Sequence, residues 1–151
     1  MLFRSPDDTD SPGPTVISTA ALAEVATWYP GLSEQDARRR FRANLEFGRC
    51  PAFWEDRLFG DEGGSVAFTI GDVRARGINP CRRCIVPTRD PDSGEARDGF
   101  QRTFVARRRE TLPSWARRSR FDFFYRLSVN TCVDASQAGK VLRTGDPVRM
   151  A

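Results

Sequence analysis

The stretch PCRRCIVPTRDPDSG, residues 80–94, carries the strongest chemical signal in this chain. It holds two of the four cysteines, Cys81 and Cys84, with two arginines between them, and then runs into a turn-forming Asp-Pro-Asp-Ser-Gly sequence. A guanidinium group beside a thiol stabilises the thiolate, which is the form that ligates metals and attacks electrophiles. Soft metals select thiolate ligands. Because the chain contains no histidine, any metal or redox chemistry here would fall on cysteine.

Short apolar or alternating segments surround this stretch and predict the fold class. Six of them have the pattern of strands: 15–17, 41–47, 66–70, 73–78, 121–129 and 141–150. Three have helix signals: 18–28, with Ser18 or Thr19 as its cap, 33–40, which begins like a capping box, and 104–110. Short strands mixed with a few helices predict an α+β fold, a mixed β-barrel with short peripheral helices.

The alternation within residues 41–47 places Arg42 and Asn44 on one face of the predicted strand. A guanidinium and an amide that lie side by side could bind an anionic ligand through hydrogen bonds. The alternative interpretation is a solvent-facing polar strand edge.

Length and composition favour one domain with a real core. The chain has 151 residues, of which 39% are apolar, including eleven Phe and three Trp. We expect a flexible N-terminal segment over residues 1–13 and a single domain over residues 14–151. The N-terminal segment has no apolar signal core, and no stretch has the length of a membrane-spanning helix. These features predict a cytoplasmic protein with reduced cysteines.

The net charge is +4, and almost all of the positive charge comes from arginine. The run Arg38-Arg39-Arg40 is predicted to be a solvated helix face. A second basic group is interleaved with Trp115 and Phe121, as on surfaces that bind single-stranded nucleic acid: Arg107, Arg108, Arg109, Arg117, Arg118 and Arg120. The same group could dock an acidic electron-transfer partner or could simply be solvated, and the many acidic residues make nucleic-acid binding the weaker alternative.

Six sequence pieces, in order, carry a resemblance to a known family. They are the entry segment 15–22, RFRAN at 40–44, WED at 54–56, IGDV at 70–73, the CRRC stretch with Thr88 and DPDSG, and GDPV at 145–148. The chain therefore resembles the MOSC domain, the C-terminal module of molybdenum cofactor sulfurase. It is most similar to the bacterial and mitochondrial amidoxime-reducing proteins that share this module.

The resemblance implies a site for a molybdenum cofactor of the molybdopterin type. In the family's reductases the second cysteine of the signature ligates molybdenum, which corresponds to Cys84 here. Arg42 and Asn44 would line the pterin, and Arg83 would hold the cofactor phosphate. Cys81, expected to be buried, and Thr88, expected to brace the turn, complete the candidate cofactor-binding residues. The reaction would be reduction of an N-oxygenated substrate, with electrons from a separate protein.

The chain also departs from the family pattern. These 151 residues contain no match to the small β domain that usually precedes this module or to the pyridoxal-phosphate domain that supplies sulfur in cofactor sulfurase. A missing N-terminal β domain, for instance on another chain, is therefore a possible partner. Tyr125 stands where the family has a glycine. Two alternatives therefore stay open: a sulfur carrier that holds a persulfide on Cys84 and receives sulfur from a donor protein, or a non-catalytic or nucleic-acid-binding barrel. A zinc site and a thioredoxin-like CxxC are disfavoured because Cys50 and Cys132 are isolated and Pro87 follows closely.

Overall fold

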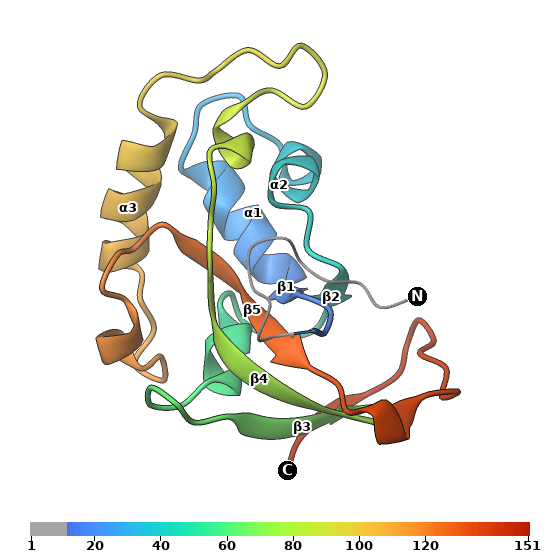
Figure 1. Ribbon diagram of the computed structural model, residues 1–151. Helices are drawn as coiled ribbons and strands as arrows, with labels where there is room; N and C mark the ends of the chain where they lie inside the picture. The colour runs from blue at the N-terminus through green and yellow to red at the C-terminus, as the bar shows by residue number, and fades with distance from the viewer. Residues whose placement is uncertain (1–11) are drawn as a thin grey trace.

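The computed structural model describes residues 12–151, and one six-stranded mixed sheet organises them. The strands lie in the order β2 (Leu45–Phe47), β1 (Val16–Ser18), β5 (Arg126–Cys132), β4 (Val73–Arg82), β3 (Val66–Ile70) and β6 (Val148–Met150). Strands β1 and β2 are parallel, and the other neighbours are antiparallel. The sheet curls into a half-barrel (Figure 1), which confirms the predicted α+β barrel class. The predicted flexible segment, residues 1–13, lies almost wholly outside the described residues.

Three α-helices and four short 3-10 turns accompany the sheet in the described part of the chain. The helices are α1 (Thr19–Thr27), α2 (Glu34–Phe41) and α3 (Phe100–Glu110), and the 3-10 turns are η1 (Trp54–Leu58), η2 (Val86–Thr88), η3 (Arg118–Arg120) and η4 (Ala135–Gln137). Ser18 caps α1 by accepting the backbone N–H of Ala21 at 3.2 Å, as predicted. Ser33 and Asp36 form the predicted capping box of α2.

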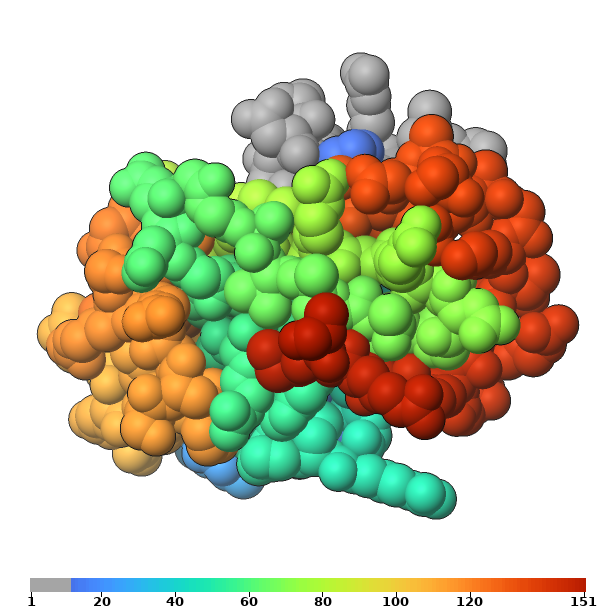
Figure 2. Space-filling view, turned by 90° about the horizontal axis from the view of Figure 1, so that it is seen from below, coloured from blue at the N-terminus to red at the C-terminus, as the bar shows by residue number. Residues whose placement is uncertain are grey.

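Figure 1 shows how the cysteine stretch is placed by this arrangement. The chain leaves the upper end of β4 and rises past α1 to η2, and a long connection then leads to α3 at the side of the molecule. Helix α2 packs against η2, so the segment after β4 is held between the sheet and the helices. In the space-filling view, the C-terminal strand β6 lies against β3 on the lower face (Figure 2).

The core consists of two aromatic clusters that meet at a buried ion pair. One cluster contains Phe53 and gathers residues of α1, α2 and α3, and the other contains Phe121 and gathers residues of β3, β4 and β5. The guanidinium of Arg108 lies 4.1 Å from the Phe53 ring centroid and 5.0 Å from that of Phe121. It donates to Asp56 at 2.6 Å, and both side chains are 1% exposed. Arg108 is therefore a core residue and does not belong to the predicted basic surface.

The structure corrects the predicted strand at residues 41–47. Phe41 is the last residue of α2, Arg42 adopts a left-handed conformation with φ of 53°, and the strand spans only Leu45–Phe47. The reason is packing: Ala37 and Phe41, four residues apart on α2, both enter the core, so tertiary contacts extend the helix past the apparent alternation. Arg42 and Asn44 therefore do not project side by side from a strand.

Two further predictions fail for the same reason. The strand predicted at 121–129 begins only at Arg126. In the irregular segment before it, the rings of Phe121 and Phe124 stack on each other, with their centroids 5.8 Å apart. Arg40, predicted to be solvated, is buried at 5% exposure and donates from Nη1 to the carbonyl oxygens of Pro87 and Arg89. It fixes α2 to η2, beside the candidate site.

Candidate functional site

A cavity of about 570 Å³ opens at the end of β4 and contains both cysteines of the CRRC stretch. Strand β4 continues to Arg82, four residues beyond its predicted end, so Cys81 lies in the strand and Cys84 just after it. Among the lining residues are Asn79, Cys81, Arg83, Cys84, Arg126 and Asn130. The structure thus brings together three of the predicted site residues, Cys81, Arg83 and Cys84.

The two cysteines have different surroundings. Cys84 is exposed, whereas Cys81 is 6% exposed, which agrees with the expectation that Cys81 is buried. Arg83 donates from Nη1 to the Cys81 sulfur at 3.3 Å, and its other terminal nitrogen donates to the carbonyl oxygen of Phe41. The guanidinium therefore contacts the buried thiol and α2, and no hydrogen bond joins it to Cys84.

A local irregularity in the sheet positions Arg83. The pairing of β4 with β5 shifts register between Pro80 and Arg82, and Ser128 in the middle of β5 has a left-handed φ of 67°. This conformation is costly for a residue with a side chain, and it persists here because the surrounding strands are fixed. It turns the Ser128 hydroxyl toward Arg83, whose Nη1 lies 3.3 Å away.

The cavity carries more positive than negative charge. Four arginines line it, Arg82, Arg83, Arg120 and Arg126, against two carboxylates, Glu62 and Asp122. Arg120 donates to the backbone carbonyls of Gly60, Asp61 and Ile78, and Arg126 donates to Pro80 and Asp122. These contacts use some of the guanidinium donors and leave the side-chain charges in place, so the cavity favours an anionic ligand.

Three buried polar atoms near this cavity have no hydrogen-bond partner among the described residues: Nε of Arg83, Nε of Arg126 and the hydroxyl of Tyr125. Burial raises the pKa of Tyr125 to about 12, so the phenol stays protonated at neutral pH. Its backbone carbonyl accepts the N–H of Arg83 at 3.0 Å, which places Tyr125 next to the cysteine stretch. Buried polar groups are normally paired, so these atoms mark a place where a ligand or water is expected.

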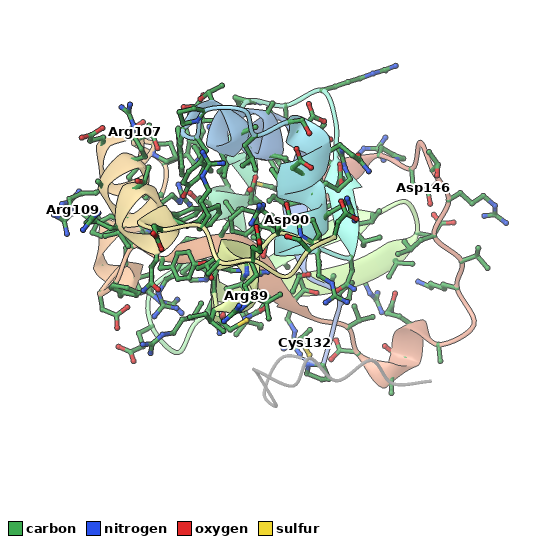
Figure 3. The ribbon with its side chains drawn as sticks, turned by 90° about the horizontal axis from the view of Figure 1, so that it is seen from above. Arg89, Asp90, Arg107, Arg109, Cys132 and Asp146 are labelled. Carbon is green, nitrogen blue, oxygen red and sulfur yellow. The ribbon has the colours of Figure 1, made fainter. Side chains whose placement is uncertain are left out.

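The other predicted residues lie outside this cavity. Arg42 lines a second cavity of about 480 Å³ with Arg40, Arg89 and Asp90. The side-chain oxygen of Asn44 accepts from the backbone N–H of Thr15 at 2.8 Å, which links the end of α2 to β1. In Figure 3 the labelled Arg89 and Asp90 lie near the middle of the view from above.

Thr88 and Asp90 shape the turn after the cysteines, as expected. The Thr88 hydroxyl donates to the carbonyl oxygen of Ile85 at 2.6 Å, and Thr88 is 8% exposed. One side-chain oxygen of Asp90 accepts the backbone N–H groups of Asp92 and Ser93, both at 2.9 Å. These bonds lower the pKa of Asp90 and hold the turn that follows η2.

Sequence reasoning missed the buried acidic pair Glu55 and Asp56 as an electrostatic feature. Glu55 accepts the backbone N–H of Ser18 at 3.1 Å through one oxygen, while its other oxygen is buried without a partner. Burial raises the pKa of Glu55 to about 7, and the neighbouring Asp56 adds to the shift. Adjacent acidic residues normally indicate a surface. The apolar neighbours Phe53, Trp54 and Leu58 are the signal that could have pointed to burial.

Within residues 12–151, no group of three or more Cys, Asp or Glu side chains could hold a metal ion by itself. None of the helices there is long and apolar enough to cross a membrane. Any metal at Cys84 would thus need further ligands from a bound cofactor or from another part of the site.

Comparisons with known proteins identify the family and relatives of this chain. The model of the MOSC domain family matches residues 15–149. The human mitochondrial amidoxime-reducing component 1 is 32% identical over 96 residues, which cover 62% of this chain and 26% of that protein. The rat mitochondrial amidoxime reducing component 2 is 35% identical over 79 residues, covering 52% of this chain and 20% of that protein. The aligned regions thus span about a quarter or less of these relatives.

Proposed function

Because the chain belongs to the MOSC domain family, which is associated with the molybdenum cofactor, we propose that it binds this cofactor at the Cys84 cavity. We further propose that it serves a reductase of N-oxygenated compounds, the class to which its relatives' names point. The observation that carries the proposal is the exposed Cys84 thiol at the edge of a cavity whose charged lining is four arginines against two carboxylates.

The residues present fit such a group. A cysteine thiolate is a suitable ligand for a soft, thiolate-seeking metal site. The arginines of the cavity suit the phosphate of an anionic cofactor. The unpartnered Nε atoms of Arg83 and Arg126 and the Tyr125 hydroxyl would supply further hydrogen bonds. Arg42, whose side chain forms no hydrogen bond or ion pair within the described residues, remains a candidate for the pterin or phosphate.

In this proposal Cys84 holds the metal, and the chain's other residues keep it in place. Arg83 joins the end of β4 to α2 and β5, so the backbone before Cys84 is rigid. The bound cofactor would supply two-electron redox chemistry. The net reaction consumes two electrons and two protons, breaks the N–O bond of an N-hydroxylated substrate, forms an N–H bond and releases water. The electrons come from a separate protein.

Molybdenum content measured by elemental mass spectrometry tests this proposal. The wild-type domain, purified from a cofactor-producing host, is compared with Cys84→Ala, and Cys132→Ala serves as a matched control at a cysteine that does not line the cavity. We expect near-stoichiometric metal in the wild type and in the control, and loss of metal in Cys84→Ala. Equal metal in all three proteins, or none in the wild type, would contradict it.

The exposure of Cys84 also supports a second candidate, a sulfur carrier with a persulfide on this residue. The chain then needs a sulfur donor and no metal in its resting state. Cyanide releases sulfane sulfur from a persulfide as thiocyanate. Release from the wild type that is absent in Cys84→Ala would favour the carrier, and a metal-loaded protein without releasable sulfur would exclude it.

A further inference from the structure

Three exposed arginines lie against the rings of two consecutive residues, Phe123 and Phe124, beside the Cys84 cavity. The guanidinium of Arg82 lies 5.9 Å from the Phe123 ring centroid. Those of Arg109, on α3, and Arg118, in η3, lie 5.1 and 5.5 Å from the Phe124 ring centroid. We call Arg82, Arg109 and Arg118 the arginine face.

The positive charge of this face is poorly compensated. Across residues 12–151, neither Arg109 nor Arg118 forms an ion pair, although both lie against the same ring. The nearby carboxylates serve other arginines: Glu110 pairs with Arg107 at 3.4 Å, and Asp122 pairs with Arg126 at 2.7 Å. Because stacking on rings restrains the guanidinium groups, a binding partner would meet partly pre-ordered charges.

The position of the arginine face connects it to the site. Arg82 itself lines the Cys84 cavity, and so does Ser119, which follows Arg118 directly. In Figure 3, Arg107 and Arg109 mark the side of α3, and Asp146 lies at the opposite side of the molecule. In Figure 2 the orange segment that contains η3 likewise lies opposite the red segment before β6.

We propose that the arginine face docks an acidic protein, namely the electron carrier that the reduction requires. This inference rests on the proposed function, which needs electrons from another protein near Cys84. An acidic surface would neutralise Arg109 and Arg118 and would bring the carrier's redox group beside the cavity. Charge complementarity of this kind raises the association rate and orients the partners.

The structure favours a protein over a nucleic acid as the partner. Binding of single strands combines phosphate contacts with exposed aromatic rings on which bases stack. Here the rings are covered: Phe121 is 4% exposed and Phe124 is 7% exposed. Trp115 is half-buried, lies 4.5 Å from the guanidinium of Arg57 and donates its indole N–H to the carbonyl oxygen of Phe53. Phe123 is half-buried and lies against Arg82, so the arginine face offers fixed positive charge without a fully exposed aromatic ring.

The test measures binding of the metal-free domain to an acidic plant-type [2Fe–2S] ferredoxin at low ionic strength, by fluorescence anisotropy with the labelled carrier. The test variant is Arg109→Gln with Arg118→Gln. The matched control is Arg143→Gln with Arg149→Gln, which removes the same charge from two exposed arginines of the C-terminal segment, outside α3 and η3. We expect the test pair to weaken binding by about tenfold and the control pair by less than about twofold. Circular dichroism checks that each variant is folded.

Two further measurements separate the alternatives. Arg109→Lys with Arg118→Lys keeps the charge and should keep binding. If the lysine pair loses as much affinity as the glutamine pair, the effect comes from a displaced Phe124 ring and the proposal is overturned. A short oligothymidylate that binds the same face more tightly than the ferredoxin would assign the surface to nucleic acid instead. Equal weakening by test and control pairs, or no ferredoxin binding, would also overturn it. Because the protein is metal-free, these outcomes are independent of whether Cys84 binds molybdenum.

Discussion

Replacing Glu55 by Gln should stabilise the protein at neutral and alkaline pH. Glu55 is completely buried, and burial raises its pKa from an ordinary 4.5 to about 7. The folded state therefore holds a proton that the unfolded chain has already released between about pH 4.5 and pH 7. Over this window stability falls as pH rises, and the full cost of the buried charge is present above pH 7.

The size of the effect follows from the pKa shift. A difference of about 2.5 pKa units corresponds to about 3 kcal/mol, since each unit is worth about 1.4 kcal/mol. The glutamine carbonyl can still accept the N–H of Ser18, so that hydrogen bond is kept. We expect Glu55→Gln to raise the free energy of unfolding by up to about 3 kcal/mol at pH 8 and to have little effect near pH 4.5.

Urea denaturation monitored by tryptophan fluorescence, repeated between pH 4.5 and pH 8, measures this difference. Glu62→Gln is the matched control because Glu62 is exposed. The gain in Glu55→Gln should grow as pH rises through the window, and the control should stay close to the wild type throughout. A gain that does not change with pH, or a loss at pH 8, would show that the buried carboxyl is not the source of the pH dependence.

Two other substitutions test the packing. Gly77→Ala should destabilise the domain by about 3 kcal/mol or more, because its Cβ on β4 would lie 1.7 Å from a backbone carbonyl oxygen of η1. Gly48→Ala is the control, because its Cβ meets no atom within 4 Å. Thermal unfolding should give a much lower melting temperature for Gly77→Ala, and similar melting temperatures for the two variants would refute the contact. Asp56→Asn should cost about 3–5 kcal/mol, because it leaves Arg108 buried without its counter-charge. Asp134→Asn, at an exposed ion pair, is the control, and equal urea midpoints for the two variants would contradict the buried pair.

The sequence alone determined the features that depend on local chemistry. Capping by Ser18 and Ser33, the hairpin turn at Gly71-Asp72 and the turn at Asp90 all form as predicted, because neighbouring residues make their hydrogen bonds. The α+β barrel class and the family membership also followed from the order of short motifs. So did the grouping of Cys81, Arg83 and Cys84, which are adjacent along the chain.

Only the tertiary structure decided which polar residues are buried and what each contacts. Arg40 and Arg108 lie in arginine runs that suggest a surface, yet long-range contacts with η2 and with Asp56 bury them. Arg42 leaves the predicted strand because Phe41 is drawn into the core as part of α2. The alternation of apolar and polar residues, and runs of charged residues, indicate only which side chains a segment could expose. Burial depends on contacts with residues distant in sequence, and those contacts set the final conformation.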